Sequence, residues 1–501
     1  MLKYPIGIQD FRTLREGGYA YVDKTEHIHR LLTTGKYYFF TRPRRFGKSL
    51  TVATMNELYS GSRELFDGLW VQDPWDFEAM RRPVVWLQLA RLDYREKRLS
   101  KALLDELHRI AQTHQLTLPE GTLKETFSEM LRRLSGQHGR VVLLVDEYDK
   151  PIIDYLDDLP QAEANRELLK SFYSVIKDSD PFLELVFITG VSAFSKVSIF
   201  SDLNHLRNLS LSPQTNTLVG ITEAELDHYF GPVLAAVDRA QLRRWYNGYS
   251  WTGEQTVYNP FSLLNFLADG VYRNYWFETG TPTFLVEALR DRQLYPLGEL
   301  ELTQQDIGAF DISRLETYPL LFQTGYLTVI EAQPAIGSYR LDFPNLEVKQ
   351  SLEEMLLRAY ASEDPGNPRS RVLTIYHALG RKDIDSVIMA INSVLANVPY
   401  DLWQRDDERT FHTLVHLLFS LLGVIVQSEV HTARGRCDAL VLTNDYVYAF
   451  EFKVNATAQA ALDQIEAHGY LAPYTDDPRE KVAVGISFDR ASRRIGAWAE
   501  A

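Results

Sequence analysis

The 501-residue chain contains one cysteine, Cys437, and this scarcity excludes two kinds of site. A single cysteine can form neither an internal disulfide nor a cysteine-based zinc site. The first residues, Met1 to Pro5, lack the apolar stretch of a secretory signal. No apolar run approaches the ~18 residues that cross a bilayer. We therefore expect a soluble, cytoplasmic protein with no membrane partner.

Positive charge is also in deficit. The chain has 53 Lys and Arg against 67 Asp and Glu, which gives a formal net charge of −14. Proteins that coat nucleic acid gain affinity by neutralising phosphates, so this balance argues against that class, although it is compatible with a local basic groove. The 45% hydrophobic and 24% charged residues are typical of a globular protein. The length favours several domains over one.

Four short apolar runs in the first half of the chain alternate with amphipathic stretches. The runs cover residues 37–41, 84–89, 141–145 and 183–189, and helical patterns such as 99–114 and 122–134 lie between them. Nearly continuous apolar runs of this length are typical of buried parallel strands. Residues 1–230 therefore predict an α/β domain with a parallel sheet.

The rest of the chain divides into two further parts. Residues 231–350 are rich in aromatic and turn residues, with a helical pattern at 261–268 and a strand-like run at 338–343. They predict a small, mostly helical domain that ends in a hairpin. Residues 351–501 begin with helices and end in an α+β pattern, which predicts a third domain.

A phosphate-binding string follows the first apolar run. It reads Arg42, Pro43, Arg44, Arg45, Phe46, Gly47, Lys48, Ser49. Gly47, Lys48 and Ser49 fit the pattern G-x-x-x-x-G-K-[ST], and Arg42 stands in place of the first glycine. Backbone N–H groups at the start of a helix would bind phosphate, with Lys48 on the outer phosphates and Ser49 on Mg²⁺. We therefore expect residues 44–49 to bind ATP.

The third apolar run ends in Asp146 and Glu147, at the edge of the sheet where open α/β folds bind ligands. Asp146 would hold Mg²⁺, directly or through water, and Glu147 would act as the general base on the attacking water. Either string alone can arise by chance, but both in this order predict a nucleotide site. Because the first glycine is missing, nucleotide that is bound and hardly hydrolysed stays an alternative.

Two other strings have a weaker connection with the nucleotide. The fourth apolar run ends at residues 189–192, where a polar side chain could sense the terminal phosphate, and a simple glycine turn explains the string equally well. Asp23, Lys24 and Thr25 precede the first run and could lie near the base or ribose. For them we favour the start of a helix, with an N-cap side chain.

A hairpin near the end of the chain carries a second candidate site. The strand-like runs 437–442 and 446–453 are joined by a short polar turn at 443–445. If the turn centres on residues 444–445, counting outward places Asp438 opposite Glu451. Lys453, two positions further, lies on the same face. The sequence therefore brings two carboxylates and a lysine together.

Such a pair of carboxylates repels unless a cation lies between them, and Mg²⁺ prefers carboxylate oxygens. A metal there would assist phosphodiester hydrolysis, while Lys453 oriented the water or stabilised the developing charge. Glu408, in a helical pattern at 408–422, could add a metal ligand. His412 is better explained as a hydrogen-bonded helix residue, and Gln464 either approaches the site or faces solvent. The alternative is a solvated, salt-bridged face.

The chain resembles bacterial and archaeal proteins that join an AAA-ATPase-like domain to a C-terminal PD-(D/E)XK nuclease domain. The resemblance covers nearly the whole chain and depends on short strings at residues 5–11, 21–25, 42–49, 146–151, 189–192, 258–262, 275–282, 435–438 and 450–453. The arginine-rich form of the phosphate loop is itself typical of that family, so Arg42 is less of a defect than the general pattern suggests.

The resemblance implies three domains. They are a P-loop ATPase of the additional-strand type at 1–230, a helical or winged-helix-like lid at 231–350, and a restriction-endonuclease-like domain at 351–501. Asp438, Glu451 and Lys453 match the superfamily motif D…ExK, and Glu408 matches its preceding helix carboxylate. We expect an ATP-regulated, Mg²⁺-dependent nuclease that acts on DNA rather than RNA. A nucleotide-dependent switch or a remodelling ATPase are alternatives, and self-association stays open.

Overall fold

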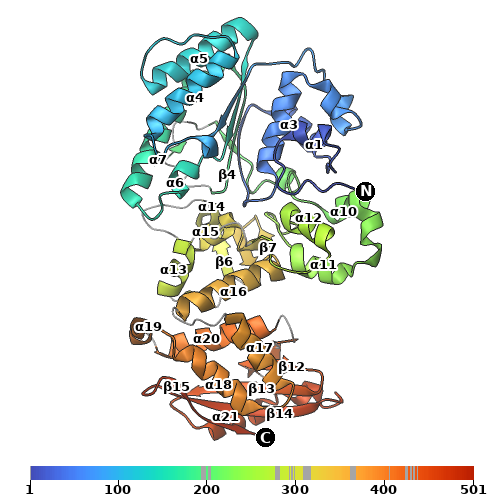
Figure 1. Cartoon of the computed structure of the whole chain (residues 1–501), viewed down its shortest axis with the longest axis vertical. Coiled ribbons are helices and arrows are strands. Elements are labelled where there is room, and N and C mark those ends of the chain that lie inside the picture. The colour runs from blue at the N-terminus through green and yellow to red at the C-terminus, as the bar shows by residue number, and fades with distance from the viewer. Residues whose placement is uncertain are drawn as a thin grey trace. The chain divides into compact units, whose positions relative to one another are not determined.

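The computed structural model describes the chain except for residues 1, 193–198, 201–202, 204, 277–282, 293, 295–296, 298–299, 309–316, 362–367, 406, 424–426, 429–430, 433–434 and 437. Cys437 and residues 277–282 of the sequence strings thus lie outside the described part. The chain forms two compact units (Figure 1). One comprises Met1–Glu278 and Gly298–Glu347, and the other comprises Thr279–Leu297 and Val348–Ala501. None of the described helices is long and apolar enough to cross a membrane.

The first unit contains a five-stranded parallel sheet with the order β2-β3-β4-β1-β5. Its strands are β1 (Tyr37–Thr41), β2 (Val84–Gln88), β3 (Val141–Asp146), β4 (Leu183–Gly190) and β5 (Arg207–Asn208). The four apolar runs thus form strands, and the parallel α/β prediction is confirmed. β4 lies between the strand before the phosphate loop and the strand that ends in Asp146, which is the arrangement of an additional-strand P-loop ATPase.

Helices cover both faces of this sheet. Figure 1 shows α4, α5 and α7 on one face and α1 and α3 on the other. Their bounds are α1 (Phe11–Glu16), α2 (Thr25–Thr34), α3 (Lys48–Ser60), α4 (Leu99–Thr113), α5 (Leu123–His138), α6 (Lys150–Ile153), α7 (Leu159–Tyr173) and α8 (Val175–Asp178). α5 begins at a capping box in which Thr122 and Glu125 satisfy each other's backbone N–H groups.

The aromatic-rich segment belongs largely to the first unit. Its helices include α10 (Glu223–Phe230), α11 (Arg239–Tyr246) and α12 (Pro260–Asp269), which share one apolar core. A second group follows, β6 (Leu300–Thr303), α14 (Gln304–Gly308), α15 (Thr317–Thr324), β7 (Thr328–Gln333) and β8 (Ser338–Asp342). The three strands are antiparallel in the order β6-β8-β7, so strand, two helices and hairpin make a winged-helix-like arrangement.

The second unit is a mixed sheet with helices. Its helices are α13 (Thr283–Asp291), α16 (Leu346–Tyr360), α17 (Pro368–Leu379), α18 (Ile384–Leu395), α19 (Tyr400–Arg405), α20 (Asp407–Leu422) and α21 (Ala458–His468), of which α16 begins with the last two residues of the first unit. The main strands are β9 (Gln427–Ser428), β12 (Ala439–Leu442), β13 (Tyr446–Val454), β14 (Glu480–Asp489) and β15 (Arg494–Glu500). Their order is β15-β14-β13-β12-β9, with only β13 and β14 parallel, and a separate short pair joins β10 (His431–Thr432) to β11 (Gly435–Arg436).

The period of two along β13 separates its two faces. Phe450 and Phe452 contact Phe419 of α20, at 5.0 and 5.8 Å between ring centroids. Ala449 instead packs in a cluster with Leu462 of α21. Helices therefore cover the sheet on both sides, and the odd-numbered positions of β13 face α21.

Candidate functional sites

The phosphate loop connects β1 to α3 as the sequence predicts. Arg45 and Gly47 both have positive φ, 71° and 97°, which closes the loop tightly. Lys48, the first residue of α3, is buried and its Nζ donates to the Pro43 carbonyl at 2.8 Å. Burial lowers the pKa of Lys48, while Glu147 and other nearby acids act in the opposite direction. A buried cation inside a loop at a helix N-terminus is what phosphate binding needs.

Arg42 stands where the general phosphate-loop pattern has its first glycine, and it has a structural role there. Its guanidinium is buried and donates to the carbonyls of Thr41 at 2.8 Å, Ser210 at 2.7 Å and Thr215 at 2.9 Å. It also lies 3.8 Å from the ring centroid of Trp251. Burial lowers its pKa. Arg42 therefore anchors the base of the loop to the segments around residues 210–215 and 251.

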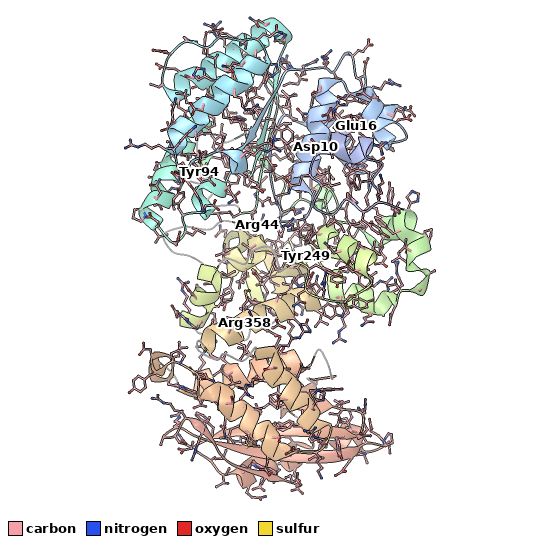
Figure 2. All side chains as sticks on the ribbon, viewed as in Figure 1. Asp10, Glu16, Arg44, Tyr94, Tyr249 and Arg358 are labelled. Carbon is pink, nitrogen blue, oxygen red and sulfur yellow. The ribbon has the colours of Figure 1, made fainter. Side chains whose placement is uncertain are left out.

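Aromatic residues from the 231–350 segment pack directly on the loop. Phe46 meets Tyr249 at 4.7 Å between ring centroids, and the Arg45 guanidinium lies 4.4 Å from the ring centroid of Phe261. Gly325 comes so close that an added Cβ would lie 2.7 Å from a carbon of Pro43. Figure 2 shows Arg44 of the loop and Tyr249 of the aromatic-rich segment, at the place in the first unit where this segment meets the parallel-sheet part. The loop is therefore supported from outside the parallel-sheet domain.

The end of β3 supplies the acidic side of the nucleotide site. Asp146 is buried and lies near Ser49, whose hydroxyl acts to lower its pKa, and its Oδ1 has no hydrogen-bond partner among the described residues. Burial raises its pKa to about 6. Glu147 has the left-handed φ of 53°, which is unfavourable for a residue with a Cβ. An unpartnered carboxylate oxygen beside a serine hydroxyl fits an Mg²⁺ ion bound with nucleotide.

Asp149 is a functional candidate that the sequence did not single out. Its carboxylate is buried, and Oδ2 accepts from Val191 N at 3.0 Å, Ser192 N at 2.7 Å and Ser192 Oγ at 2.7 Å. Its place in the acidic stretch 146–149, after the third apolar run, is the sequence signal that could have identified Asp149. The Ser192 hydroxyl already donates to this carboxylate. Thr189 is buried, and its Oγ1 has no hydrogen-bond partner among the described residues. Its role as a phosphate sensor stays a prediction.

The favoured interpretation of residues 23–25 holds in a modified form. Lys24 is the N-cap of α2 without a side-chain cap, and Asp23 Oδ1 accepts from Thr25 N at 2.8 Å instead. Lys24 is buried and pairs with Glu225, at 2.6 Å from Nζ to Oε1. These contacts describe a helix start and a buried ion pair, and a place near the base or ribose stays a prediction.

The C-terminal hairpin has the register that counting from the turn predicts. Ala439 pairs with Phe450, so the next position outward places Asp438 opposite Glu451. Asp438 Oδ2 accepts from the backbone N of Phe452 at 2.9 Å. The Asp438 side chain is exposed, whereas Glu451 is only 2% exposed. One carboxylate is thus open to solvent and the other is enclosed beneath it.

Glu451 has partners on only one of its two oxygens. Oε1 accepts from Lys453 Nζ at 3.0 Å and from the side-chain amide of Gln464, on α21. Oε2 is buried and has no hydrogen-bond partner among the described residues. Burial raises the pKa of Glu451, the Asp438 charge raises it further, and Lys453 lowers it. From the sequence, Gln464 could either approach the site or face solvent. Its contact with Glu451 places it at the site.

Glu408 is paired with a basic residue. Its Oε2 pairs with Arg490 in the turn between β14 and β15, at 2.6 Å, and both side chains are largely exposed. His412 is in ring contact with its neighbour Phe411 at 5.6 Å. Within the described residues, no three His, Cys, Asp or Glu side chains form a metal cluster. Glu408 as a metal ligand therefore stays a prediction.

A metal site with two protein carboxylates still fits the hairpin. Mg²⁺ keeps several waters and is commonly held by one or two carboxylates together with substrate phosphates. The unpartnered Oε2 of Glu451 and the exposed carboxylate of Asp438 are donors of that type, and Lys453 adds a cation at their side.

Comparisons with known proteins identify the two domains that carry these candidate sites. A family model described as a predicted AAA-ATPase matches residues 5–200, and one described as the PD-(D/E)XK nuclease superfamily matches residues 406–498. The chain is also 41% identical over 508 residues to a protein from Azotobacter chroococcum mcd 1, described as an uncharacterized protein in the vnfD 5′ region, with 98% of each chain covered. The chain thus belongs to the same family as that protein, and it joins an AAA-ATPase-like domain to a PD-(D/E)XK nuclease superfamily domain.

Proposed function

We propose that this protein is an ATP-binding, Mg²⁺-dependent nuclease that hydrolyses phosphodiester bonds of DNA under the control of nucleotide. The observation that carries the nuclease half is Glu451, a buried carboxylate with one unpartnered oxygen beside Asp438 and Lys453. Burying such a group without a partner is costly, so a fold that does so has a use for the free oxygen. DNA is the substrate that the restriction-endonuclease-like resemblance implies.

The hairpin residues divide the work of hydrolysis. Asp438 and Glu451 would hold Mg²⁺, which polarises the phosphodiester and lowers the pKa of a water. Lys453 donates to Glu451 Oε1 and is close enough to orient that water or to stabilise charge on the phosphate. Gln464 donates to the same oxygen, so Oε1 is fixed and Oε2 is left for the metal.

The first unit would bind ATP with the loop 44–49. Lys48 would move from the Pro43 carbonyl to the outer phosphates, and Ser49 and Asp146 would hold Mg²⁺ there. Glu147 would accept the proton of the attacking water. Its carboxylate acts on Lys48 more strongly than any other charge, which supports a position beside the phosphates.

Nucleotide control would run through packed residues of the first unit. Phe46 of the loop packs on Tyr249, and Tyr249 lies against the turn at Gly325 and Tyr326. The Tyr326 ring lies 5.1 Å from that of Trp276. Trp276 N in turn donates to Glu347, the last residue of this unit, at 2.8 Å. Contiguous packing of this kind is a physical route by which a change in the loop can reach the unit boundary.

A cleavage assay tests the nuclease half. Linear and circular DNA are incubated with Mg²⁺ and wild-type protein, Asp438→Ala or Lys453→Ala. Each substitution is expected to lower the cleavage rate by roughly 100-fold or more, since metal binding or charge stabilisation is lost. Glu408→Ala serves as the comparison that decides whether the helix carboxylate takes part. Equal cleavage by wild type and the two hairpin variants would remove the proposal.

The net charge of −14 favours one alternative, a nucleotide-dependent switch whose nuclease-like domain binds a partner or nucleic acid without cutting. Mg²⁺ titration separates the two functions. Metal binding that is lost in Asp438→Ala and Glu451→Gln supports the nuclease. A folded hairpin with no affinity for Mg²⁺ supports the switch. A remodelling ATPase would instead show turnover that rises with its substrate and disappears in Glu147→Gln.

A further inference from the structure

The ends of β3 and β4 are tied together by one short segment, residues 148–149. Tyr148 N donates to the Thr189 carbonyl at 3.1 Å, and the Tyr148 hydroxyl donates to the Ser192 carbonyl at 2.9 Å. Asp149 Oδ2 accepts the N–H groups of Val191 and Ser192 and the Ser192 hydroxyl. Five hydrogen bonds thus join residues that are about forty positions apart, and the carbonyl of the adjacent Gly190 accepts from Arg42 N, at the start of the phosphate loop, at 3.3 Å.

Glu147 lies directly between this segment and β3. On one side Asp146 is paired with Gln88 in the sheet, and on the other Tyr148 is held by Thr189. Glu147 itself has a φ of 53°, a backbone conformation that non-glycine residues adopt only when their surroundings impose it. The hydrogen bonds of residues 148–149 are such a constraint, since they fix the chain immediately after the strained residue.

Gly190 makes room for the arrangement. A Cβ at this position would lie 2.6 Å from Asp149 Oδ1 and 2.6 Å from the Tyr148 ring. Asp149 can approach the end of β4 only because that side chain is absent. Both Asp149 and Tyr148 are buried, so bulk water does not compete for their hydrogen bonds.

We propose that Asp149 is a positioning residue for ATP hydrolysis, which holds the end of β4 so that Glu147 keeps the backbone conformation from which it acts as general base. The inference rests on the proposed ATP hydrolysis and adds a residue to it. Asp149 touches neither nucleotide nor water in this role. Its effect passes through Glu147, and that indirect action distinguishes it from a metal ligand such as Asp146.

The test compares ATP turnover and ATP affinity in the full-length protein. Asp149→Ala is expected to lower kcat by roughly 100-fold, the size of effect that a displacement of about 1 Å produces at a catalytic group. The Kd for ATP, measured with a fluorescent analogue, is expected to change by less than about 3-fold, because the Asp149 charge acts on Lys48 less than the charges of Glu147 and Asp146 do. Asp149→Asn, whose amide oxygen can still accept the two N–H groups, is expected to recover most of the rate.

Two further variants make the test specific. Tyr148→Phe removes one hydrogen bond and leaves the ring in place, so it should fold and lose a smaller part of kcat. Asp154→Asn is the matched control, because Asp154 follows shortly after Asp149 and pairs with Lys150 and Tyr94, with no hydrogen bond to residues 189–192 in the described part of the chain. It is expected to turn over ATP at the wild-type rate.

A double-mutant cycle with Glu147→Gln decides the mechanism. If Asp149 acts through Glu147, Asp149→Ala causes little further loss of kcat in the Glu147→Gln background. Full additivity of the two losses, or an Asp149→Asn variant as slow as Asp149→Ala, would overturn the positioning role. So would an Asp149→Ala variant that loses ATP affinity as Lys48→Ala does. Absence of ATP turnover in the wild type would instead overturn the proposed hydrolysis itself.

Discussion

The ring of Phe46, inside the phosphate loop, meets the ring of Tyr249 edge-on at 4.7 Å between centroids. Edge-to-face contacts of this kind depend on the position of both rings. Tyr249 is buried, and its hydroxyl has no hydrogen-bond partner among the described residues. The contact joins the loop to the segment that leads to Trp276 and Glu347. It is therefore the first place where nucleotide control can be interrupted.

Tyr249→Leu should uncouple nucleotide from cleavage. Leucine fills part of the space but cannot make the edge contact, so the ratio of DNA cleavage rates with and without ATP should fall toward one. Tyr249→Phe is the matched control, because it keeps the ring and removes only the unpartnered hydroxyl. It should retain the ATP response and raise the thermal midpoint. An unchanged response in Tyr249→Leu would contradict the route through Phe46.

Arg42→Gly should destabilise the first unit, although it restores the general phosphate-loop pattern. The substitution removes the guanidinium donor from the buried carbonyl oxygens of Thr41 and Ser210, and it leaves the Thr215 carbonyl with Leu218 N alone, at 3.3 Å. Each such loss costs about 1–3 kcal/mol, so the free energy of unfolding should fall by roughly 3 kcal/mol or more. Urea unfolding measures this, with Arg44→Gly in the same loop for comparison. A variant as stable as wild type would contradict the anchoring role of Arg42.

Glu347 predicts a specific dependence of stability on pH. Burial raises its pKa from 4.5 to about 7. The folded state therefore binds more protons than the unfolded state between those values, and stability falls as the pH rises through this window, by about 3 kcal/mol in total. Glu347→Gln keeps an acceptor for Trp276 N and removes the charge. It should be more stable than wild type at pH 8 and equal to it below pH 4.5.

The comparison needs a control on the same helix, since other groups also titrate. Glu354→Gln serves, because it makes the same chemical change at a less buried position of α16. Urea unfolding at both pH values gives the difference between each variant and wild type. A difference for Glu347→Gln that does not change with pH would show that its carboxyl titrates normally.

Gln464→Ala should weaken the nuclease site without removing a metal ligand. Losing the amide donor leaves Glu451 Oε1 with Lys453 alone, so the carboxylate is less firmly oriented. We expect the Mg²⁺ concentration for half-maximal cleavage to rise by roughly 10-fold or more. Gln459→Ala, on the same helix and paired with Asp463, should have no effect. Equal Mg²⁺ dependence of the two variants would show that Gln464 does not support the site.

The sequence predicts this fold well where hydrophobic pattern decides it. The four apolar runs form four of the five parallel strands, and the three inner ones are nearly continuous in apolar side chains because they are buried. The hairpin register follows from the period of two, which is why Asp438, Glu451 and Lys453 could be brought together before the structure was known. By contrast, β6 has an alternating, half-exposed pattern of only four residues and was not predicted.

The sequence does not predict which residues far apart in the chain form hydrogen bonds with each other. The carbonyls that bind Arg42 include two that lie 168 and 173 positions away, and Asp149 bonds with residues 42 and 43 positions away. No local pattern predicts such contacts. They depend on which strand inserts between β1 and β3 and on how the aromatic segment packs against the loop. Glu408 shows the same limit, since a residue at a motif position pairs with Arg490, 82 positions away.

The most direct test of the account is the rate of Mg²⁺-dependent DNA cleavage as ATP is titrated, with wild type, Glu451→Gln and Lys48→Ala measured side by side. Glu451→Gln is expected not to cleave DNA at any ATP concentration. The wild-type rate is expected to change with ATP and to half-saturate at the Kd for ATP, and Lys48→Ala is expected to lose this response. A wild-type rate that is the same with and without ATP, or cleavage by Glu451→Gln at the wild-type rate, would contradict the account.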